Sequence, residues 1–137
     1  IGEYVQDYLI KELAGEFGEL KASQGKFSDY DLISPDGYTF EVKFDRQSEF
    51  TNNTAIEFRY KGKPSGITNT KAIEWVQVLY SGDSWVYCRI PVNTLKNFLR
   101  NNWDYFTFTM GGDNKQSSLI LVNKEIFLEE FLFNPIG

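Results

Sequence analysis

The first part of the chain carries apolar side chains at spacings of three and four residues. This stripe consists of Val5, Tyr8, Leu9, Leu13, Phe17 and Leu20. Its period is that of an amphipathic helix, so we expect a helix over residues 1 to about 20. Glu12 and Glu16 fall inside the apolar arc of this helix. Two acidic residues on a face that is expected to be buried need a specific explanation.

The next part alternates between β-forming runs and turn residues. Runs at 26–33 and 38–44 flank Ser34-Pro-Asp-Gly37, whose turn-forming residues predict a β-hairpin. A third strand is expected at 54–60, followed by a loop at 61–66.

The second half of the chain predicts another hairpin and a mixture of helix and strand. Runs at 75–80 and 84–90 surround Ser81-Gly-Asp83, and Pro91 opens a helix that ends near Asn102. Later elements are an extended segment at 103–110, a loop at 111–114, a strand at 119–122 and a helical or mixed segment at 123–133. This order favours an α+β fold, similar to an α/β sandwich, with a central mixed sheet flanked by helices. The 137 residues, 42% of them hydrophobic, are expected to form a single domain, 1–137.

Composition then excludes several kinds of chemistry. The chain has no histidine, so it has neither a Ser-His-Asp triad nor a His-ligated zinc site. The single Cys88 forms no internal disulfide and predicts a reducing, cytoplasmic setting. No apolar run approaches the ~18 residues that cross a bilayer, so no membrane partner is expected. Carboxylates and lysines remain as the candidate catalytic groups.

One carboxylate–lysine constellation stands out. Asp31 lies at the end of one hairpin strand, and Glu41 and Lys43 lie two apart on the next, so the pleat directs that pair to one face. Two converging carboxylates form a site for a hard cation such as Mg²⁺ or Mn²⁺. With Lys43 beside them, this chemistry indicates phosphodiester hydrolysis. The alternative is that Asp31 caps a turn while Glu41 and Lys43 are a solvated strand face.

Tyr30-Asp31-Leu32-Ile33 followed by Glu41-Val42-Lys43 resembles the two half-motifs of the PD-(D/E)XK nuclease superfamily. Their spacing is similar to that of phage and archaeal Holliday-junction resolvases. The resemblance implies a restriction-endonuclease-like fold, Mg²⁺ or Mn²⁺ bound through Asp31 and Glu41, and cleavage of DNA.

The first helix departs from that pattern. Resolvase-like relatives often carry a Glu four residues after a Gly, and here Gly2 is followed at that offset by Gln6. Either Gln6 fills this catalytic role or an acid on the apolar face, Glu16, replaces it. The competing interpretation of Glu16 is a residue at the rim of the helix face, with its charge in water.

Residues 59–71, named the basic segment here, form a candidate phosphate-binding surface. This segment contains the cations Arg59, Lys61, Lys63 and Lys71 and no acid, within a chain of formal net charge −5. With the small Ser65, such a loop offers positive charge and amide groups to a DNA backbone. The alternative is an ordinary solvated loop.

Two further features have open interpretations. Glu57 is either an outer metal ligand or the ion-pair partner of Arg59 on the same strand face. The tryptophans suggest base stacking, but their spacing is typical of core positions, and an exposed ring beside residues 61–67 would favour stacking.

The sequence therefore predicts a divalent-metal-dependent endodeoxyribonuclease, of phage origin by resemblance, acting on branched or replicating DNA in the cytoplasm of a bacterial host. A homodimer is expected if cutting is symmetric. The alternatives are a sequence-specific restriction or homing endonuclease and a non-catalytic nucleic-acid-binding module of the same fold.

Overall fold

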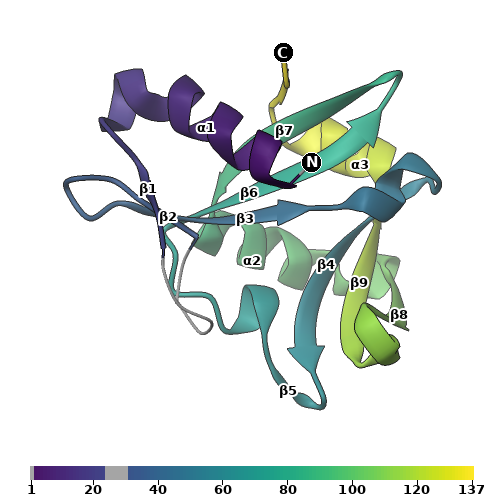
Figure 1. The fold of residues 1–137 in the computed structure, drawn as a ribbon. Coiled ribbons are helices and arrows are strands. Elements are labelled where there is room, and N and C mark those ends of the chain that lie inside the picture. Colours follow the sequence, from purple (N-terminus) through teal and green to yellow (C-terminus); the bar gives the residue numbers. More distant parts are fainter. Residues whose placement is uncertain (1, 24–30) are drawn as a thin grey trace.

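The described strands form two sheets, and α-helices pack against them (Figure 1). The computed structural model describes residues 2–23 and 31–137. The larger sheet has the strand order β1 (Lys21–Ala22), β2 (Leu32–Ile33), β3 (Thr39–Phe44), β6 (Glu74–Ser81), β7 (Ser84–Pro91) and β10 (Phe133–Pro135). The smaller sheet has the order β5 (Lys63–Pro64), β4 (Asn53–Tyr60), β9 (Ser117–Asn123) and β8 (Thr107–Gly111). The helices are α1 (Gly2–Phe17), α2 (Val92–Asn101) and α3 (Lys124–Glu130).

The larger sheet is mixed, as predicted. β3 runs parallel to β6, whereas the other neighbouring strands in this sheet are antiparallel. A parallel pair needs a crossover, and here the crossover is the chain that contains β4, β5 and the 3₁₀ helix η2 (Gly66–Thr68). The expected α+β class is therefore confirmed.

The prediction of one central sheet was incomplete, because the strands after the crossover form a sheet of their own. The 3₁₀ helix η1 (Arg46–Glu49) turns the chain out of the larger sheet after β3. The Asp45 carboxylate then accepts hydrogen bonds from the Thr54 hydroxyl at 2.7 Å and the Ala55 amide at 2.8 Å. These bonds attach the start of β4 to the end of β3, so β4 leaves at an angle and pairs with β9.

Each face of the larger sheet has its own core. On one face, Leu9 of α1 packs in a buried cluster with Phe40 and Val76. On the other face, Trp75 packs in a cluster that includes Ile56 of β4 and residues of α2, β9 and α3. Figure 1 shows α1 on the first face and α2, β4 and β9 on the second. A side chain's position along β3 or β6 therefore decides which core it faces.

Helix α1 ends earlier than the apolar stripe predicts. Gly18 adopts φ +82° and its amide donates to the Ala14 carbonyl at 2.8 Å, which closes the helix at Phe17. Leu20 is still buried in the core beside α1, because the chain turns back over the sheet after the helix. The apolar stripe thus identified the buried residues correctly, but not the end of the helix.

Several later predictions are confirmed and one is corrected. The second hairpin is β6–β7, and the helices expected after Pro91 and within 123–133 are α2 and α3. The segment 103–110 was predicted to be extended throughout, but Trp103–Tyr105 forms the 3₁₀ helix η3 before β8 begins. The 3₁₀ helix η4 (Asp113–Lys115) lies within the turn between β8 and β9. Of the strand expected at 26–33, only β2 is seen, since residues 26–30 lie outside the described residues.

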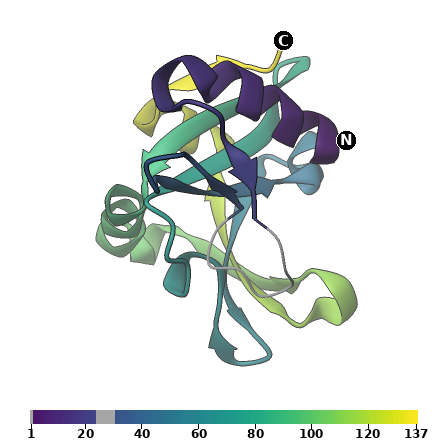
Figure 2. The same ribbon diagram turned by 60° about the vertical axis from the view of Figure 1, so that its left-hand side comes forward.

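Two hairpins extend away from the larger sheet on the side opposite α1. Figure 2 shows the β4–β5 hairpin in blue to teal and the β8–β9 hairpin in light green, projecting at the lower end of the molecule. Lys61 and Gly62 both have positive φ, 51° and 78°, as the tight turn between β4 and β5 requires. Within the described residues, none of the helices has both the length and the apolar character needed to cross a membrane.

Candidate active site

The β2–β3 hairpin brings Asp31 against β3, as the sequence predicts. The Gly37 amide donates to the Ser34 carbonyl at 3.0 Å, and Gly37 has the positive φ, +86°, that this turn needs. The Asp31 carboxylate Oδ2 accepts a hydrogen bond from the Val42 amide at 2.7 Å, and the Asp31 amide donates to the Phe40 carbonyl at 2.8 Å. Asp31 is thus fixed beside the middle of β3.

Glu41 and Lys43 lie on the face of β3 that is directed away from α1. Their register partners on β6 are Trp75 and Gln77, and Trp75 belongs to the core on that face. Lys43 Nζ lies 3.4 Å from Glu41 Oε2 and 5.8 Å from the centre of the Trp75 ring. The carboxyl groups of Glu41 and Asp31 lie close enough to interact, and Asp31 helps to raise the pKa of Glu41. The structure therefore brings together Asp31, Glu41 and Lys43, which we name the paired-carboxylate site.

The electrostatics of this site are unfavourable for two ionised carboxylates. Burial raises the pKa of Glu41 to about 7; the Lys43 charge opposes the rise, and the charge and hydrogen bond of Asp31 add to it. The Thr70 hydroxyl donates to Glu41 Oε1 at 3.2 Å and favours the ionised form. The side chain of Glu41 is only 14% exposed, whereas that of Lys43 is 40% exposed. Glu41 thus holds a proton near neutral pH beside a lysine that remains accessible.

Glu57 lies close to this site, and its hydrogen-bond partner is not the one that the sequence suggested. The Ser65 hydroxyl donates to Glu57 Oε2 at 2.9 Å, and no Glu57–Arg59 ion pair is found in the described residues. A bulge between Glu57 and Arg59 shifts the register of β4 against β9, so the two side chains do not share one face as residues two apart do in a regular strand. Lys43 and Glu57 line one open cavity of about 170 Å³.

The loop after β5 is pressed onto Glu57. Gly66 has φ +54°, and a Cβ atom at this position would lie 2.1 Å from the Glu57 carbonyl oxygen. Only glycine fits this close approach. The Ser65 amide donates to the Phe58 carbonyl at 3.1 Å, so both its hydroxyl and its amide are used inside the protein. Ser65 therefore positions the loop, and its amide already has an acceptor within the protein.

The four cations of the basic segment are exposed and surround this loop. These residues are Arg59, Lys61, Lys63 and Lys71. Within the part of the chain that the structure describes, none of them has a carboxylate within ion-pair distance. The segment begins two residues after Glu57 and ends one residue after Thr70, which donates to Glu41. The two ends of the basic segment thus follow Glu57, which lines a cavity with Lys43, and Thr70, which contacts Glu41.

Neither helix residue proposed for the site is brought to it. Gln6 and Glu16 belong to α1, which packs on the opposite face of the larger sheet from Glu41 and Lys43. Glu16 forms an ion pair with Arg89, with Oε1 3.1 Å from Nη1. The period of the helix placed Glu16 near the sheet correctly, but a partner from β7 that is distant in sequence takes up its charge.

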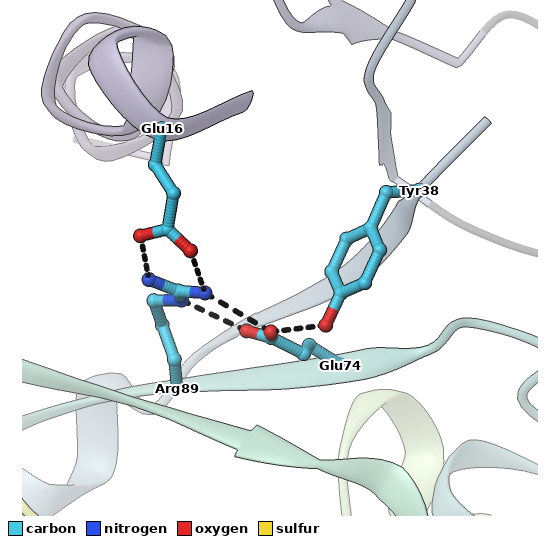
Figure 3. Close-up of polar contacts among 4 residues, drawn as sticks. All are labelled: Glu16, Tyr38, Glu74 and Arg89. Carbon is cyan, nitrogen blue, oxygen red and sulfur yellow. Dashed lines mark hydrogen bonds and ion pairs between the residues drawn. The ribbon is translucent and has the colours of Figure 1, made fainter. Parts of the chain in front are cut away.

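Arg89 connects Glu16 to a second carboxylate, as Figure 3 shows. The guanidinium donates to Glu74 through Nε at 2.8 Å and Nη2 at 3.0 Å, and Glu74 also accepts a hydrogen bond from the Tyr38 hydroxyl. Burial and this bond raise the pKa of Tyr38 to about 12. We name Glu16, Tyr38, Glu74 and Arg89 the arginine cluster. Its hydrogen bonds tie α1 to β6, β7 and the residue before β3, which explains an acid at the apolar face of α1.

Sequence reasoning missed the polar side chains that support the site. Thr70 follows the 3₁₀ helix η2, and nothing in its spacing along the sequence indicates that it reaches Glu41. Gln77 is fully buried; its amide nitrogen donates to the Thr54 hydroxyl at 2.8 Å and its oxygen accepts from the Trp75 indole at 2.8 Å. A glutamine in an otherwise apolar strand is the signal that would have found it, since a buried amide needs partners.

The donor set suits a magnesium or manganese ion. The described residues contain no group of three or more acidic, cysteine or histidine side chains that would enclose a metal. Mg²⁺ is commonly held by one or two carboxylates, with water and substrate phosphate completing its shell, so Asp31 and Glu41 match that requirement. A cation would also offset the repulsion that helps to raise the pKa of Glu41. No family model matches this chain, and no curated protein matches it in sequence.

Proposed function

We propose that the protein is a divalent-metal-dependent endodeoxyribonuclease. The observation that carries this proposal is the interaction of Asp31 with Glu41 beside the accessible Lys43, near residues that adjoin the two ends of the basic segment. A bound Mg²⁺ or Mn²⁺ would polarise the phosphate and lower the pKa of a water molecule. These residues support that chemistry without a histidine.

The residues of the site have separable roles in this proposal. Asp31 and Glu41 hold the ion, and the Val42 amide and the Thr70 hydroxyl orient their carboxylates. Lys43 is the group that contacts the attacking water or the charge that develops on the phosphate, because its ammonium is accessible and 3.4 Å from Glu41.

The basic segment is proposed to bind the DNA backbone. Its cations lack internal carboxylate partners in the described residues, so phosphates are their natural partners in a chain of net charge −5. Lys61 and Lys63 lie at the tip of the β4–β5 hairpin, and Lys71 follows Thr70 beside Glu41. DNA lying along this segment would bring a phosphate to the paired-carboxylate site.

Restriction-endonuclease-like architecture, phage origin and action on branched DNA remain part of the proposal, as the motif resemblance implies. The central experiment incubates the protein with Mg²⁺ or Mn²⁺ and linear duplex, single-stranded, nicked or four-way-junction DNA. We expect cleavage by the wild type, and a loss of at least about a hundredfold in each of Asp31→Asn, Glu41→Gln and Lys43→Ala.

The matched control is Glu12→Gln, an exposed acid on α1 and away from this face of the sheet. It removes one carboxylate from the same chain and should cleave like the wild type. Binding of DNA without any cleavage would instead support the non-catalytic binding module. Near-normal turnover in any of the three site variants would contradict the assignment of that residue.

A further inference from the structure

A second cavity lies beside the basic segment, between the smaller sheet and α2. It has a volume of about 350 Å³, within the range of small-ligand sites. Its apolar wall is formed by β4, η2, α2 and β9, and two aromatic rings, Phe58 and Trp103, line it. We name it the aromatic pocket. Neither the cleavage chemistry nor the basic segment accounts for it.

Trp103 differs from the buried tryptophan of the core because its side chain is partly exposed. It is 41% exposed, whereas Trp75 is fully buried in the core. Its ring meets Phe58 edge to face at 5.8 Å and lies 4.7 Å from Phe108. Neighbours on these sides hold the indole in place, so a flat ligand would lose little side-chain entropy on stacking against it. The sequence favours base stacking only if an aromatic ring is exposed beside residues 61–67. Trp103 meets this condition, because it lines the same pocket as Ile67.

The rim of the aromatic pocket is positively charged. Lys96 and Arg100 line it from one face of α2, and the described residues that line the pocket include no carboxylate. Arg59 of the basic segment lies over the Phe58 ring, with Cζ 5.7 Å from its centre. A ligand that carries negative charge is therefore attracted to the mouth of the pocket, and an apolar, planar part of the same ligand fits the interior. A nucleotide combines these two properties, because it carries a flat base and an anionic phosphate.

The aromatic pocket and the paired-carboxylate site share one loop. Glu57 and Phe58 are consecutive on β4; Glu57 lines the cavity shared with Lys43, and Phe58 lines the aromatic pocket. Gly66 is pressed against Glu57, and the next residue, Ile67, lines the aromatic pocket. The two places lie on opposite faces of the smaller sheet, with the basic segment between them, so a DNA strand that follows this segment from one place leads to the other.

From this arrangement we infer that the aromatic pocket binds the base of an unpaired nucleotide next to the site of cleavage. The base stacks against Trp103 while Lys96 and Arg100 contact neighbouring phosphates. This rests on the proposed function for its DNA substrate, and it deepens that proposal by naming the substrate class: DNA that presents at least one unpaired base. A base within intact duplex does not enter such a pocket without leaving its stack.

The test measures binding without turnover, so it does not depend on cleavage. Fluorescein-labelled oligo(dT) and a blunt hairpin duplex are titrated with the full chain in EDTA. We expect Trp103→Ala to weaken oligo(dT) binding roughly 5- to 150-fold, the range produced by the loss of one base–aromatic stack. Duplex binding should change less than about twofold, and Trp103→Phe should retain most of the affinity, because phenylalanine also stacks.

Two further variants test whether a loss of affinity in Trp103→Ala comes from misfolding or from a nonspecific effect. Lys96→Ala combined with Arg100→Ala changes only side chains on α2, and it should reduce the salt slope on oligo(dT) by roughly 1.4, about 0.7 for each lost phosphate contact. Trp85→Phe is the matched control, because Trp85 packs against Phe44 and Tyr80 and does not line the pocket. In the Trp85→Phe protein, oligo(dT) should quench the fluorescence of Trp103.

The outcomes separate the two proposals. Equal oligo(dT) affinity in wild type and folded Trp103→Ala would overturn the aromatic pocket, while metal-dependent cleavage would still support the nuclease. Trp103-dependent binding of oligo(dT) by a protein that cleaves no DNA would support the pocket and overturn the nuclease. Binding of an apolar dye at Trp103 that oligo(dT) fails to displace would also overturn the nucleotide assignment.

Discussion

The two charged clusters of the larger sheet lie on opposite faces and differ in how their charges are balanced. In the arginine cluster, one guanidinium is hydrogen-bonded to Glu16 and Glu74, and a tyrosine hydroxyl bonds Glu74 as well. In the paired-carboxylate site, two acids contact each other and a single lysine lies beside one of them. The first arrangement satisfies its partners inside the protein, whereas the second leaves bonding capacity for a partner from outside.

The difference lies in whether the fold itself compensates the charge of each carboxylate. The carboxylates of the arginine cluster have a cation within 3.1 Å, so folding alone compensates them. Glu41 instead has a pKa raised to about 7, first through burial, which shows a carboxylate that the fold does not fully stabilise. Carboxyls perturbed in this way beside an open cavity are typical of functional sites.

The largest expected effect on stability comes from breaking the arginine cluster. Arg89→Met leaves Glu74, only 7% exposed at its side chain, without a cation. Loss of one partner of a buried pair costs about 3–5 kcal/mol of the free energy of unfolding, with Glu16, 60% exposed, contributing little. Urea denaturation monitored by circular dichroism measures this. Arg89→Lys, which retains the charge, should lose less, and equal stability of Arg89→Met and wild type would show that the cluster contributes nothing.

Removing the negative charge of Glu41 from the paired-carboxylate site should raise the free energy of unfolding, whereas breaking the arginine cluster lowers it. Because the pKa of Glu41 is raised to about 7 in the folded protein, the folded state retains a proton that the unfolded chain releases above about pH 4.5. Stability from this group is therefore present at low pH, falls as the pH rises from about 4.5 to 7, and levels off above 7. The total change is at most ~3 kcal/mol.

Glu41→Gln should remove that pH dependence and be more stable than wild type at pH 8. The amide keeps the shape of the side chain and accepts the Thr70 hydrogen bond. Denaturation at pH 5 and pH 8 measures both proteins, with Glu12→Gln as the control for simple charge removal. An identical pH dependence in Glu41→Gln and wild type would contradict the raised pKa.

A divalent metal should affect the paired-carboxylate site and not the arginine cluster. Mg²⁺ or Mn²⁺ that binds only the folded protein stabilises it by about 2.7 kcal/mol at a hundred times Kd, and the melting temperature rises accordingly. Asp31→Asn should abolish this rise, and it should stabilise the metal-free protein by reducing repulsion with Glu41. Glu74→Gln in the arginine cluster is the contrasting variant, which should keep the metal effect. Equal shifts in Asp31→Asn and wild type would remove the site as the metal centre.

The smallest effect, on DNA affinity and its salt dependence, is expected at the basic segment, because its charges are exposed. Lys61→Ala combined with Lys63→Ala should reduce the slope of log K against log salt for duplex DNA by nearly 1.8, about 0.9 for each phosphate contact. Affinity should fall by a similar factor for all sequences, while cleavage at saturating DNA changes little. Lys11→Ala, an exposed lysine on α1, is the control. A double variant with wild-type salt slope would move the DNA-binding surface elsewhere.

The helices, the hairpins and the pairing of neighbouring strands follow from patterns that are local in the sequence. The period of three and four gave the buried face of α1, the Ser34-to-Gly37 turn gave the β2–β3 hairpin, and the spacing of two gave the shared face of Glu41 and Lys43. These features depend on residues that are close in the chain. Turn chemistry and side-chain period are sufficient to predict them.

The contacts between groups that are distant in the sequence follow from the packing of the whole fold. The partner of Glu16 is 73 residues away and the residue that donates to Glu41 is 29 residues away, and no local pattern encodes either pairing. The division into two sheets depends on Asp45 bonding to the start of β4, and the exposure of Trp103 depends on how α2 and β9 pack. Long-range contacts form where burial and hydrogen bonding are satisfied together over the whole fold, so their positions follow from packing and not from spacing.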